Sequence, residues 1–136
     1  MKTAKLILGF MAIIFLIAAD TAWSKTEQSM NSKEIMDITD LDGDGKIDLK
    51  EYRNRITDVY FFLDADKDGK LTVVEIQRSM PDLDPALVDN ADVNGDTIIT
   101  IYEFRYVLYK DFDVMDKNKD GSLDQQEMKT AIEERE

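Results

Sequence analysis

The chain has 136 residues, 17 basic and 29 acidic side chains, and a formal net charge of -12. This length suits one compact domain, or two small ones that share a core. The negative charge argues against DNA or RNA partners, because both are polyanions. The absence of cysteine and histidine excludes disulfides, thiolate or imidazole metal sites, and catalysis by a cysteine nucleophile or a histidine base.

The N-terminal segment has the layout of a secretory signal. Lys2 and Lys5 precede an apolar run over 6–19, and Ala22 and Ser24 place small residues at the two positions that a signal peptidase reads. The apolar run spans about 21 Å as a helix, which is short of a hydrocarbon core of about 30 Å. A removable signal therefore explains this segment better than a membrane-spanning helix.

We predict a cleavable signal peptide over 1–24 and a single compact domain over 25–136. Cleavage would remove Lys2, Lys5 and Asp20 and leave a net charge of -13. The mature protein is then expected to be exported, to the periplasm or the extracellular space, without membrane contact. The alternative is a chain anchored in the membrane by its uncleaved N-terminus.

Four twelve-residue windows repeat along the rest of the chain. They are DLDGDGKIDLKE (40–51), DADKDGKLTVVE (64–75), DVNGDTIITIYE (92–103) and DKNKDGSLDQQE (116–127), which we name loops 1 to 4. Loops 1, 2 and 4 fit D-x-[DN]-x-[DN]-G-x5-E in full, a match expected by chance at roughly one position in several hundred thousand. Three full matches in one short chain indicate a repeated cation-binding loop.

Each loop offers oxygen atoms at the spacing that calcium requires. Ca2+ takes six to eight oxygen ligands: side chains at positions 1, 3 and 5, a backbone carbonyl at position 7, an often water-mediated contact at position 9, and a bidentate glutamate at position 12. The glutamate favours calcium over magnesium, which takes six ligands in a smaller octahedron. The predicted ligands are Asp40, Asp42, Asp44, Lys46, Asp48 and Glu51 in loop 1; Asp64, Asp66, Asp68, Lys70, Thr72 and Glu75 in loop 2; Asp92, Asn94, Asp96, Ile98, Thr100 and Glu103 in loop 3; and Asp116, Asn118, Asp120, Ser122, Asp124 and Glu127 in loop 4.

Loop 3 departs from the pattern at position 6, where Thr97 replaces glycine. The backbone turns there with positive φ, which a β-branched residue adopts at a cost of about 1–3 kcal/mol, or about tenfold to hundredfold in affinity. Loop 3 also has three carboxylates at positions 1, 3, 5, 9 and 12, against five in loop 1 and four in loops 2 and 4. Because its ligand positions are kept, we predict three strong calcium sites and one weakened site over 92–103.

Apolar residues flank the loops at helical spacing, which predicts a helix before and after each one. The flanking set is Met36, Thr39, Tyr60, Leu63, Val88, Ala91, Phe112 and Met115 before the loops, apolar except for Thr39, and Tyr52, Ile56, Ile76, Met80, Phe104, Leu108, Met128 and Ile132 after them. Position 8 is also apolar in every loop, as Ile47, Leu71, Ile99 and Leu123. Such a residue suits a short β-bridge between partner loops.

With these loops and flanks, the chain resembles the EF-hand proteins of the calmodulin superfamily, and most closely the small exported EF-hand proteins of bacteria, whose hands are tightly spaced. The resemblance covers nearly all of the chain after the signal. It implies an all-α fold of four EF-hand helix–loop–helix units, with short β-bridges between paired loops and calcium as the bound ion.

The loop starts are separated by 24, 28 and 24 residues, which is too close for a separate exit helix, linker and entry helix. The segments 52–63 and 104–115 contain no glycine or proline, so each is predicted to run as one shared helix of about 15 residues, roughly 22 Å long. Pro81 ends the helix after loop 2, and Asp84 with Pro85 forms an N-cap and first turn for the next. We therefore favour pairing of loop 2 with loop 3 and of loop 1 with loop 4, over pairing of 1 with 2 and 3 with 4.

The expected function is that of an exported protein that binds up to four Ca2+, as a calcium buffer or a calcium-stabilised binding protein. No catalysis is expected, because no catalytic group converges outside the loops. The alternative is a calcium sensor that exposes an apolar surface and docks a protein partner, which the sequence does not identify. Seven aromatic residues near loops 2 and 3 are interpreted as core and not as a partner-binding groove: Tyr60, Phe61, Phe62, Tyr102, Phe104, Tyr106 and Tyr109.

Overall fold

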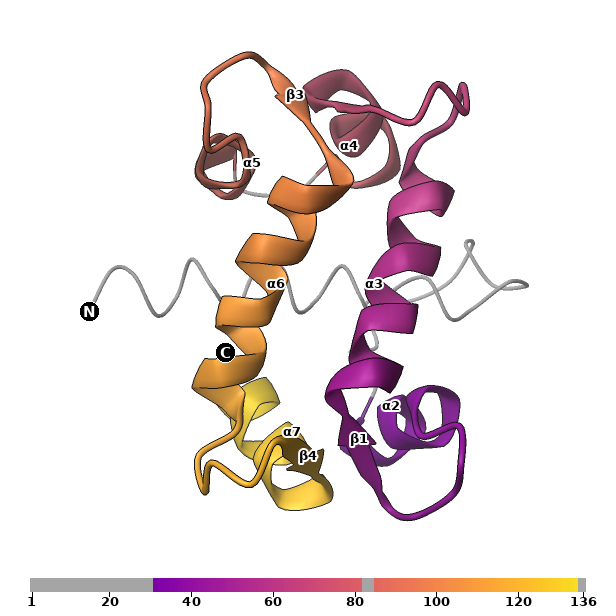
Figure 1. Ribbon diagram of the computed structural model, residues 1–136, viewed down its shortest axis with the longest axis vertical. Coiled ribbons are helices and arrows are strands. Elements are labelled where there is room, and N and C mark those ends of the chain that lie inside the picture. Colours follow the sequence, from indigo (N-terminus) through magenta and orange to yellow (C-terminus); the bar gives the residue numbers. More distant parts are fainter. Residues whose placement is uncertain (1–30, 82–84, 135–136) are drawn as a thin grey trace.

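The computed structural model describes residues 31–81 and 85–134 (Figure 1). The predicted signal peptide and the predicted N-cap Asp84 lie outside these residues. Within the two described segments, no helix combines the length and the apolar character needed to cross a membrane.

The described residues form helices joined by loops and very short strands. In chain order the elements are α2 (Ser32–Thr39), β1 (Lys46–Asp48), α3 (Leu49–Leu63), β2 (Leu71–Thr72), α4 (Val73–Ser79), α5 (Pro85–Ala91), β3 (Ile98–Ile99), α6 (Ile101–Met115), β4 (Ser122–Asp124) and α7 (Gln125–Glu133). Each of the four loops therefore lies between two helices, as predicted.

The two shared helices are present and unbroken. Helices α3 and α6 each have 15 residues, and each begins within the last three residues of one loop and ends at the residue before the next. They pass side by side in opposite directions through the middle of the molecule (Figure 1). The Arg105 guanidinium donates to the Thr57 hydroxyl at 3.0 Å, and the rings of Tyr60 and Phe104 meet at 5.6 Å between centroids. The two helices thus hold two loops at each end of the molecule.

The loops pair as predicted, one pair at each end of the molecule. Strands β1 and β4 are antiparallel with Ile47 opposite Leu123, and β2 and β3 are antiparallel with Leu71 opposite Ile99. All four of these side chains are fully buried. Loop 1 therefore pairs with loop 4, and loop 2 with loop 3, at opposite ends of α3 and α6 (Figure 1).

The reversal between the two halves follows the predicted proline signals. Helix α4 ends at Ser79, one residue before the C-cap Met80 and two before Pro81. Helix α5 begins at Pro85, whose missing N–H is not needed in a first helical turn. The short α4 and α5 lie at the end that carries loops 2 and 3 (Figure 1).

The buried core consists mainly of the predicted flanking and bridging residues. Tyr52, Ile56, Leu63, Phe104 and Leu108 are fully buried, and Thr39 is only 2% exposed. Met80 and Ile132 pack against the core while partly exposed.

The interpretation of the aromatic group as core is wrong for most of its members. Tyr60 and Phe104 are buried, but Phe61, Phe62, Tyr102 and Tyr106 are exposed, and Tyr109 is partly exposed. The reason is geometric: α3 and α6 each present one face to the core, and adjacent aromatic positions on a helix point to different faces.

An acidic side chain outside the loops lies in the core. Asp111 of α6 is fully buried, and among the described residues neither of its carboxylate oxygens has a hydrogen-bond partner. Burial raises the pKa of Asp111 from 3.8 to about 9. The side chain is therefore protonated at neutral pH, because ionisation without a partner would be unfavourable in the core.

Candidate metal sites

The aspartate at position 1 organises each loop by accepting backbone N–H groups. Its Oδ2 atom accepts from the residue at position 6, at 2.8 Å in loop 1, 2.9 Å in loop 2, 2.8 Å in loop 3 and 2.9 Å in loop 4. Its Oδ1 atom accepts from position 5 in every loop. In loop 3 the donor at position 6 is Thr97, so the substitution leaves this hydrogen bond in place.

Positions 3 and 5 repeat a second hydrogen-bond pattern. The side-chain oxygen at position 3 accepts from the N–H at position 5, between 2.8 and 3.1 Å in the four loops. The carboxylate at position 5 accepts in the same way from position 7, at 2.8 or 2.9 Å. These bonds fix the side chains at alternate positions, which is the arrangement that a curled oxygen-donor loop needs.

Three carboxylates converge in each of the first two loops. Asp40, Asp42 and Asp44 place one oxygen each within 4.8 Å of one another, as do Asp64, Asp66 and Asp68. Loops 3 and 4 carry Asn94 and Asn118 at position 3, so their sets combine an amide oxygen with carboxylates.

The glutamate at position 12 folds back over its loop. Glu51 Oε1 accepts from the N–H of Leu41 at 2.6 Å, and Glu127 Oε1 accepts from that of Lys117 at 2.8 Å. Glu75 and Glu103 accept from Ala65 at 3.1 Å and Asn94 at 3.3 Å. In all four loops the last residue therefore contacts the beginning of the loop.

The same glutamate also starts the helix that follows the loop. The residue at position 9 is the N-cap of that helix, and it forms a capping box with the glutamate in every loop. The N-caps are Asp48, Thr72, Thr100 and Asp124. The calcium-loop pattern predicts these residues as ligands, and their [DT]-x-x-E spacing is in addition a capping-box signal.

The backbone has positive φ at two positions of each loop and not only at position 6. Position 4 has φ of 76° at Gly43, 59° at Lys67, 75° at Gly95 and 60° at Lys119. Position 6 has φ of 84°, 80°, 67° and 83° in loops 1 to 4, with Thr97 as the single non-glycine residue there. Gly95 therefore occupies a left-handed position that Lys67 and Lys119 occupy in loops 2 and 4.

The charges within the loops repel one another. The N–H of Asp44 hydrogen-bonds Asp42 and by itself lowers the pKa of that carboxyl, but desolvation and the neighbouring acids Asp44, Glu51 and Asp40 together raise it above 3.8. Asp66 in loop 2 shows the same balance. A bound cation would relieve this repulsion.

Hydrogen bonds act in the opposite direction on two of the glutamates. The N–H of Thr72 lowers the pKa of Glu75, and that of Thr100 lowers the pKa of Glu103. These carboxylates are therefore ionised at neutral pH, as metal coordination requires.

The structure brings together the predicted residues within each loop, and the donor set fits a hard cation. The side-chain donors at positions 1, 3, 5 and 12 are oxygen atoms, and position 7 lies at the start of a strand or next to it, where its carbonyl belongs to the loop. Calcium prefers such an all-oxygen set. Coordination by the individual residues stays a prediction.

Two further contacts were not predicted from the sequence. The Tyr60 hydroxyl lies 3.1 Å from the carbonyl oxygen of Gly69 in loop 2 and 3.0 Å from that of Ile99 in β3, so it braces loops 2 and 3. Lys46 Nζ of loop 1 lies 2.8 Å from Asp120 Oδ2 of loop 4. The Lys46 ammonium holds the pKa of Asp120 at about 2. Both contacts depend on which loops pair, and the spacing alone does not give their geometry.

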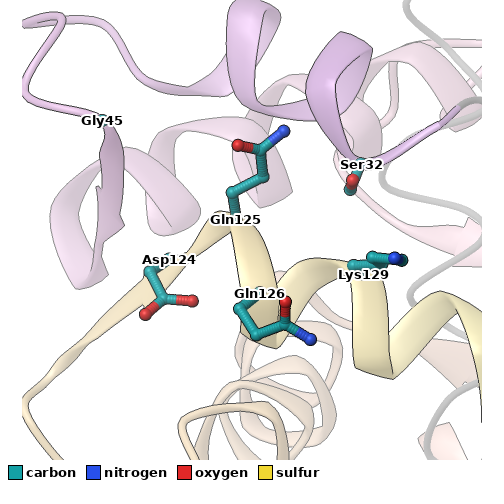
Figure 2. A pocket seen from close by; sticks show the side chains of 6 residues that line it. All are labelled: Ser32, Gly45, Asp124, Gln125, Gln126 and Lys129. Carbon is teal, nitrogen blue, oxygen red and sulfur yellow. The ribbon is translucent and has the colours of Figure 1, made fainter.

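A polar depression lies between the start of α2 and the first half of α7 (Figure 2). It is lined by Ser32 at the start of α2, Gly45 of loop 1, and Asp124, Gln125, Gln126 and Lys129 where β4 leads into α7. The depression is open to solvent and lies beside the pairing of loops 1 and 4. It belongs to the interface that positions these two loops.

Comparison with known proteins agrees with this geometry at two of the loops. The EF hand family model matches residues 33–56 and 110–132, which contain loops 1 and 4. The chain is also 32% identical to a probable calcium-binding protein, CML13, of Oryza sativa subsp. japonica, over 58% of this chain and 58% of the rice protein.

These findings show a likeness to EF hands at loops 1 and 4, and to a relative whose name gives it as a probable calcium-binding protein. The family matches cover the loops that pair through β1 and β4. The assignment of loops 2 and 3 as EF hands, and a closest likeness to exported bacterial proteins, remain predictions.

Proposed function

We propose that the protein is an exported calcium-binding protein that holds up to four Ca2+ ions and acts without catalysis. The observation that carries this proposal is the repeated frame of the loops. Position 1 accepts the N–H of position 6 in loops 1 to 4, and position 12 folds back over each loop. The family match at loops 1 and 4 supports the choice of ion.

Ion binding would be coupled to folding through the glutamates at position 12. Each of Glu51, Glu75, Glu103 and Glu127 closes its loop and also caps the following helix. A cation held by that carboxylate therefore fixes the helix start relative to the loop. Four bound calcium ions would also reduce the mature net charge from -13 to about -5, which weakens self-repulsion.

The test is thermal unfolding of residues 25–136 with saturating calcium and with an excess of a calcium chelator. One site at a calcium concentration 100 times its Kd adds about 2.7 kcal/mol, so the chelator should lower Tm by many degrees. A variant with glutamine at 51, 75, 103 and 127 is the matched control, and its Tm should respond little to the chelator. An unchanged Tm in the unaltered chain would contradict the proposal.

The same preparation gives the number of sites. Calorimetric titration should reach up to four bound calcium ions per chain, with loop 3 the weakest site. Titration with magnesium under the same conditions should give weaker binding, because a bidentate glutamate suits the larger coordination shell of calcium. Equal affinity for both ions would contradict the calcium assignment.

Export is proposed from the layout of residues 1–24, and a single domain from 25–136. Expression of the full chain in a bacterium, followed by fractionation and mass measurement of the N-terminus, tests this part. A product that begins at Lys25 in the periplasm or medium is the expected result. A full-length chain in the membrane fraction would support the alternative of an uncleaved anchor.

A second candidate function is a calcium sensor that docks a protein partner, and the exposed aromatic side chains favour it. Phe61, Phe62, Tyr102 and Tyr106 are 59%, 53%, 77% and 51% exposed. A hydrophobic dye separates the two roles: micromolar Kd values with a large calcium-dependent rise in dye binding would favour the sensor. Millimolar values with little dye response would favour the buffer or calcium-stabilised protein.

A further inference from the structure

Lys46 of loop 1 reaches a predicted metal ligand of loop 4. Strand β1 is antiparallel to β4, and Lys46 is in register with Asp124. From this place its ammonium group lies 2.8 Å from Oδ2 of Asp120, the carboxylate at position 5 of loop 4. The two side chains are 46% and 36% exposed, so solvent and salt reach the pair.

Both carboxylate oxygens of Asp120 already have partners. The N–H and hydroxyl of Ser122 donate to Oδ1 at 2.9 and 2.7 Å, and Lys46 donates to Oδ2 at 2.8 Å. At position 5 of the other loops, Asp44, Asp68 and Asp96 accept the N–H of position 7. Among the ion pairs of the described residues, only that of Asp120 involves a position-5 ligand.

The other loop pair provides an internal comparison. Lys70 occupies position 7 of loop 2, opposite loop 3, as Lys46 does in loop 1 opposite loop 4. Its counterpart at position 5 of loop 3 is Asp96. Within the described part of the chain, Lys70 forms no ion pair with that residue. The two lysines thus share their loop position, although Lys46 lies in β1 and Lys70 directly precedes β2, and they differ in this contact.

We propose that Lys46 is an intramolecular competitor of the metal ion at loop 4, and that it sets the affinity of that loop from the neighbouring one. The inference rests on the proposed function, because it requires an ion in loop 4. An incoming cation needs the Asp120 carboxylate and must displace the Lys46 ammonium from it. Removal of the lysine charge should therefore raise the calcium affinity of loop 4 selectively.

The size of the effect follows from the exposure of the pair. Exposed ion pairs contribute little, and the upper part of their measured range corresponds to about a twofold to fivefold change in an equilibrium constant. Salt screens such a pair, so the change should shrink as monovalent salt rises.

The experiment is a calcium titration of residues 25–136 followed by amide NMR. The N–H groups at position 6 report each loop separately, because they donate to the position-1 aspartate: Gly45, Gly69, Thr97 and Gly121. Lys46→Gln should move the Gly121 titration to a twofold to fivefold lower calcium concentration. Lys46→Arg, which keeps the charge, should leave it close to that of the unaltered chain.

Lys70→Gln is the matched control, since it removes the same charge at the same position of the other loop pair. It should change the Thr97 titration by less than Lys46→Gln changes that of Gly121. Contacts between Ile47 and Leu123 in the NMR spectra verify that the Lys46→Gln chain keeps the β1–β4 pairing.

Three outcomes would overturn the inference. Equal Gly121 midpoints in the unaltered chain and Lys46→Gln would reject competition by Lys46 while leaving calcium binding intact. Equal effects of Lys46→Gln and Lys70→Gln would assign the change to net charge alone. No response of Gly121 to calcium in any variant would reject both the inference and the proposed ion site in loop 4.

Discussion

The first half of the described chain, 31–80, and the second half, 85–134, follow one plan, with corresponding loop residues 52 positions apart. Each half has two loops joined by a 15-residue helix, and the halves meet through two strand pairs. The halves differ at most positions outside the loop ligands, and two of these differences matter for folding and binding. Val59 in α3 corresponds to the buried Asp111 in α6, and Gly45 in loop 1 corresponds to Thr97 in loop 3.

The second half contains two locally unfavourable features that the first half lacks. These are a buried acid whose carboxylate has no hydrogen-bond partner among the described residues, and a β-branched residue with positive φ. The braces differ as well: the Tyr60 hydroxyl connects loops 2 and 3, whereas its counterpart at 112 is a phenylalanine and cannot. At the other end, loops 1 and 4 are connected by the Lys46–Asp120 ion pair.

The largest expected effect comes from placing an acid in the first half at the position that corresponds to Asp111. Val59 is 1% exposed, so Val59→Asp would bury an acid without an evident partner. We expect a loss of about 3–5 kcal/mol in the free energy of unfolding, measured by denaturant titration at pH 7. Val59→Ala controls for the lost apolar contacts. A loss no larger than that of the alanine variant would show that this position admits water.

The reverse substitution, Asp111→Val, should stabilise the protein. The folded-state pKa of Asp111 is raised from 3.8 to about 9, so between these values the folded state binds a proton that the unfolded state releases. Stability from this group therefore falls as pH rises through that window. We expect a gain of about 2–4 kcal/mol at pH 7, and a smaller gain at pH 4.

Asp111→Asn separates charge from polarity, because asparagine cannot ionise but keeps a buried amide. Its advantage over the unaltered chain should also grow between pH 4 and pH 8 in thermal unfolding measurements. A pH-independent difference would mean that Asp111 is ionised in the folded protein and has a partner there.

A smaller effect is expected at Thr97. Thr97→Gly should tighten the loop 3 site by about tenfold to hundredfold, because glycine adopts positive φ without the β-branched side-chain clash. The change should appear in the calcium titration of loop 3, and also in that of loop 2 to the extent that β2 and β3 couple them. Gly45→Thr in loop 1 is the matched opposite and should weaken its own site. Loop 3 without calcium response at millimolar concentration, even in Thr97→Gly, would indicate a relic site.

The smallest effect is expected from Lys67→Gly in loop 2. Lys67 has φ of 59° at position 4, where loops 1 and 3 have glycine. A glycine would remove modest strain but would also gain more freedom in the unfolded chain, so we expect a change below about threefold in loop 2 affinity. A tenfold gain would show that position 4 limits affinity as strongly as position 6.

The sequence predicted the framework well because each part had a local signal. The absence of glycine and proline in 52–63 and 104–115 predicted α3 and α6, and Pro81 with Pro85 predicted the reversal that brings loop 2 to loop 3. The positive φ at Thr97 was predicted from register alone. The strain at Thr97 is partly compensated, because position 4 of the same loop also has positive φ and is occupied by Gly95.

The remaining features depend on faces and pairings that local patterns do not determine. Charged residues of a helix normally face solvent, but Asp111 lies on the buried face of α6. Phe61 and Tyr102 lie on the outer faces of helices whose inner faces are also apolar. The Lys46–Asp120 contact joins residues 74 positions apart, so it follows only after β1 has been paired with β4.

The shared helices give the four loops the connectivity of a closed ring. From loop 1, α3 leads to loop 2, the β2–β3 pair to loop 3, α6 to loop 4, and the β4–β1 pair back to the start. Every loop thus has one neighbour through a helix and one through a strand pair. The described residues therefore do not divide into two lobes that each hold a complete loop pair and its joining helix, and a movement at any loop can reach the opposite one by two routes.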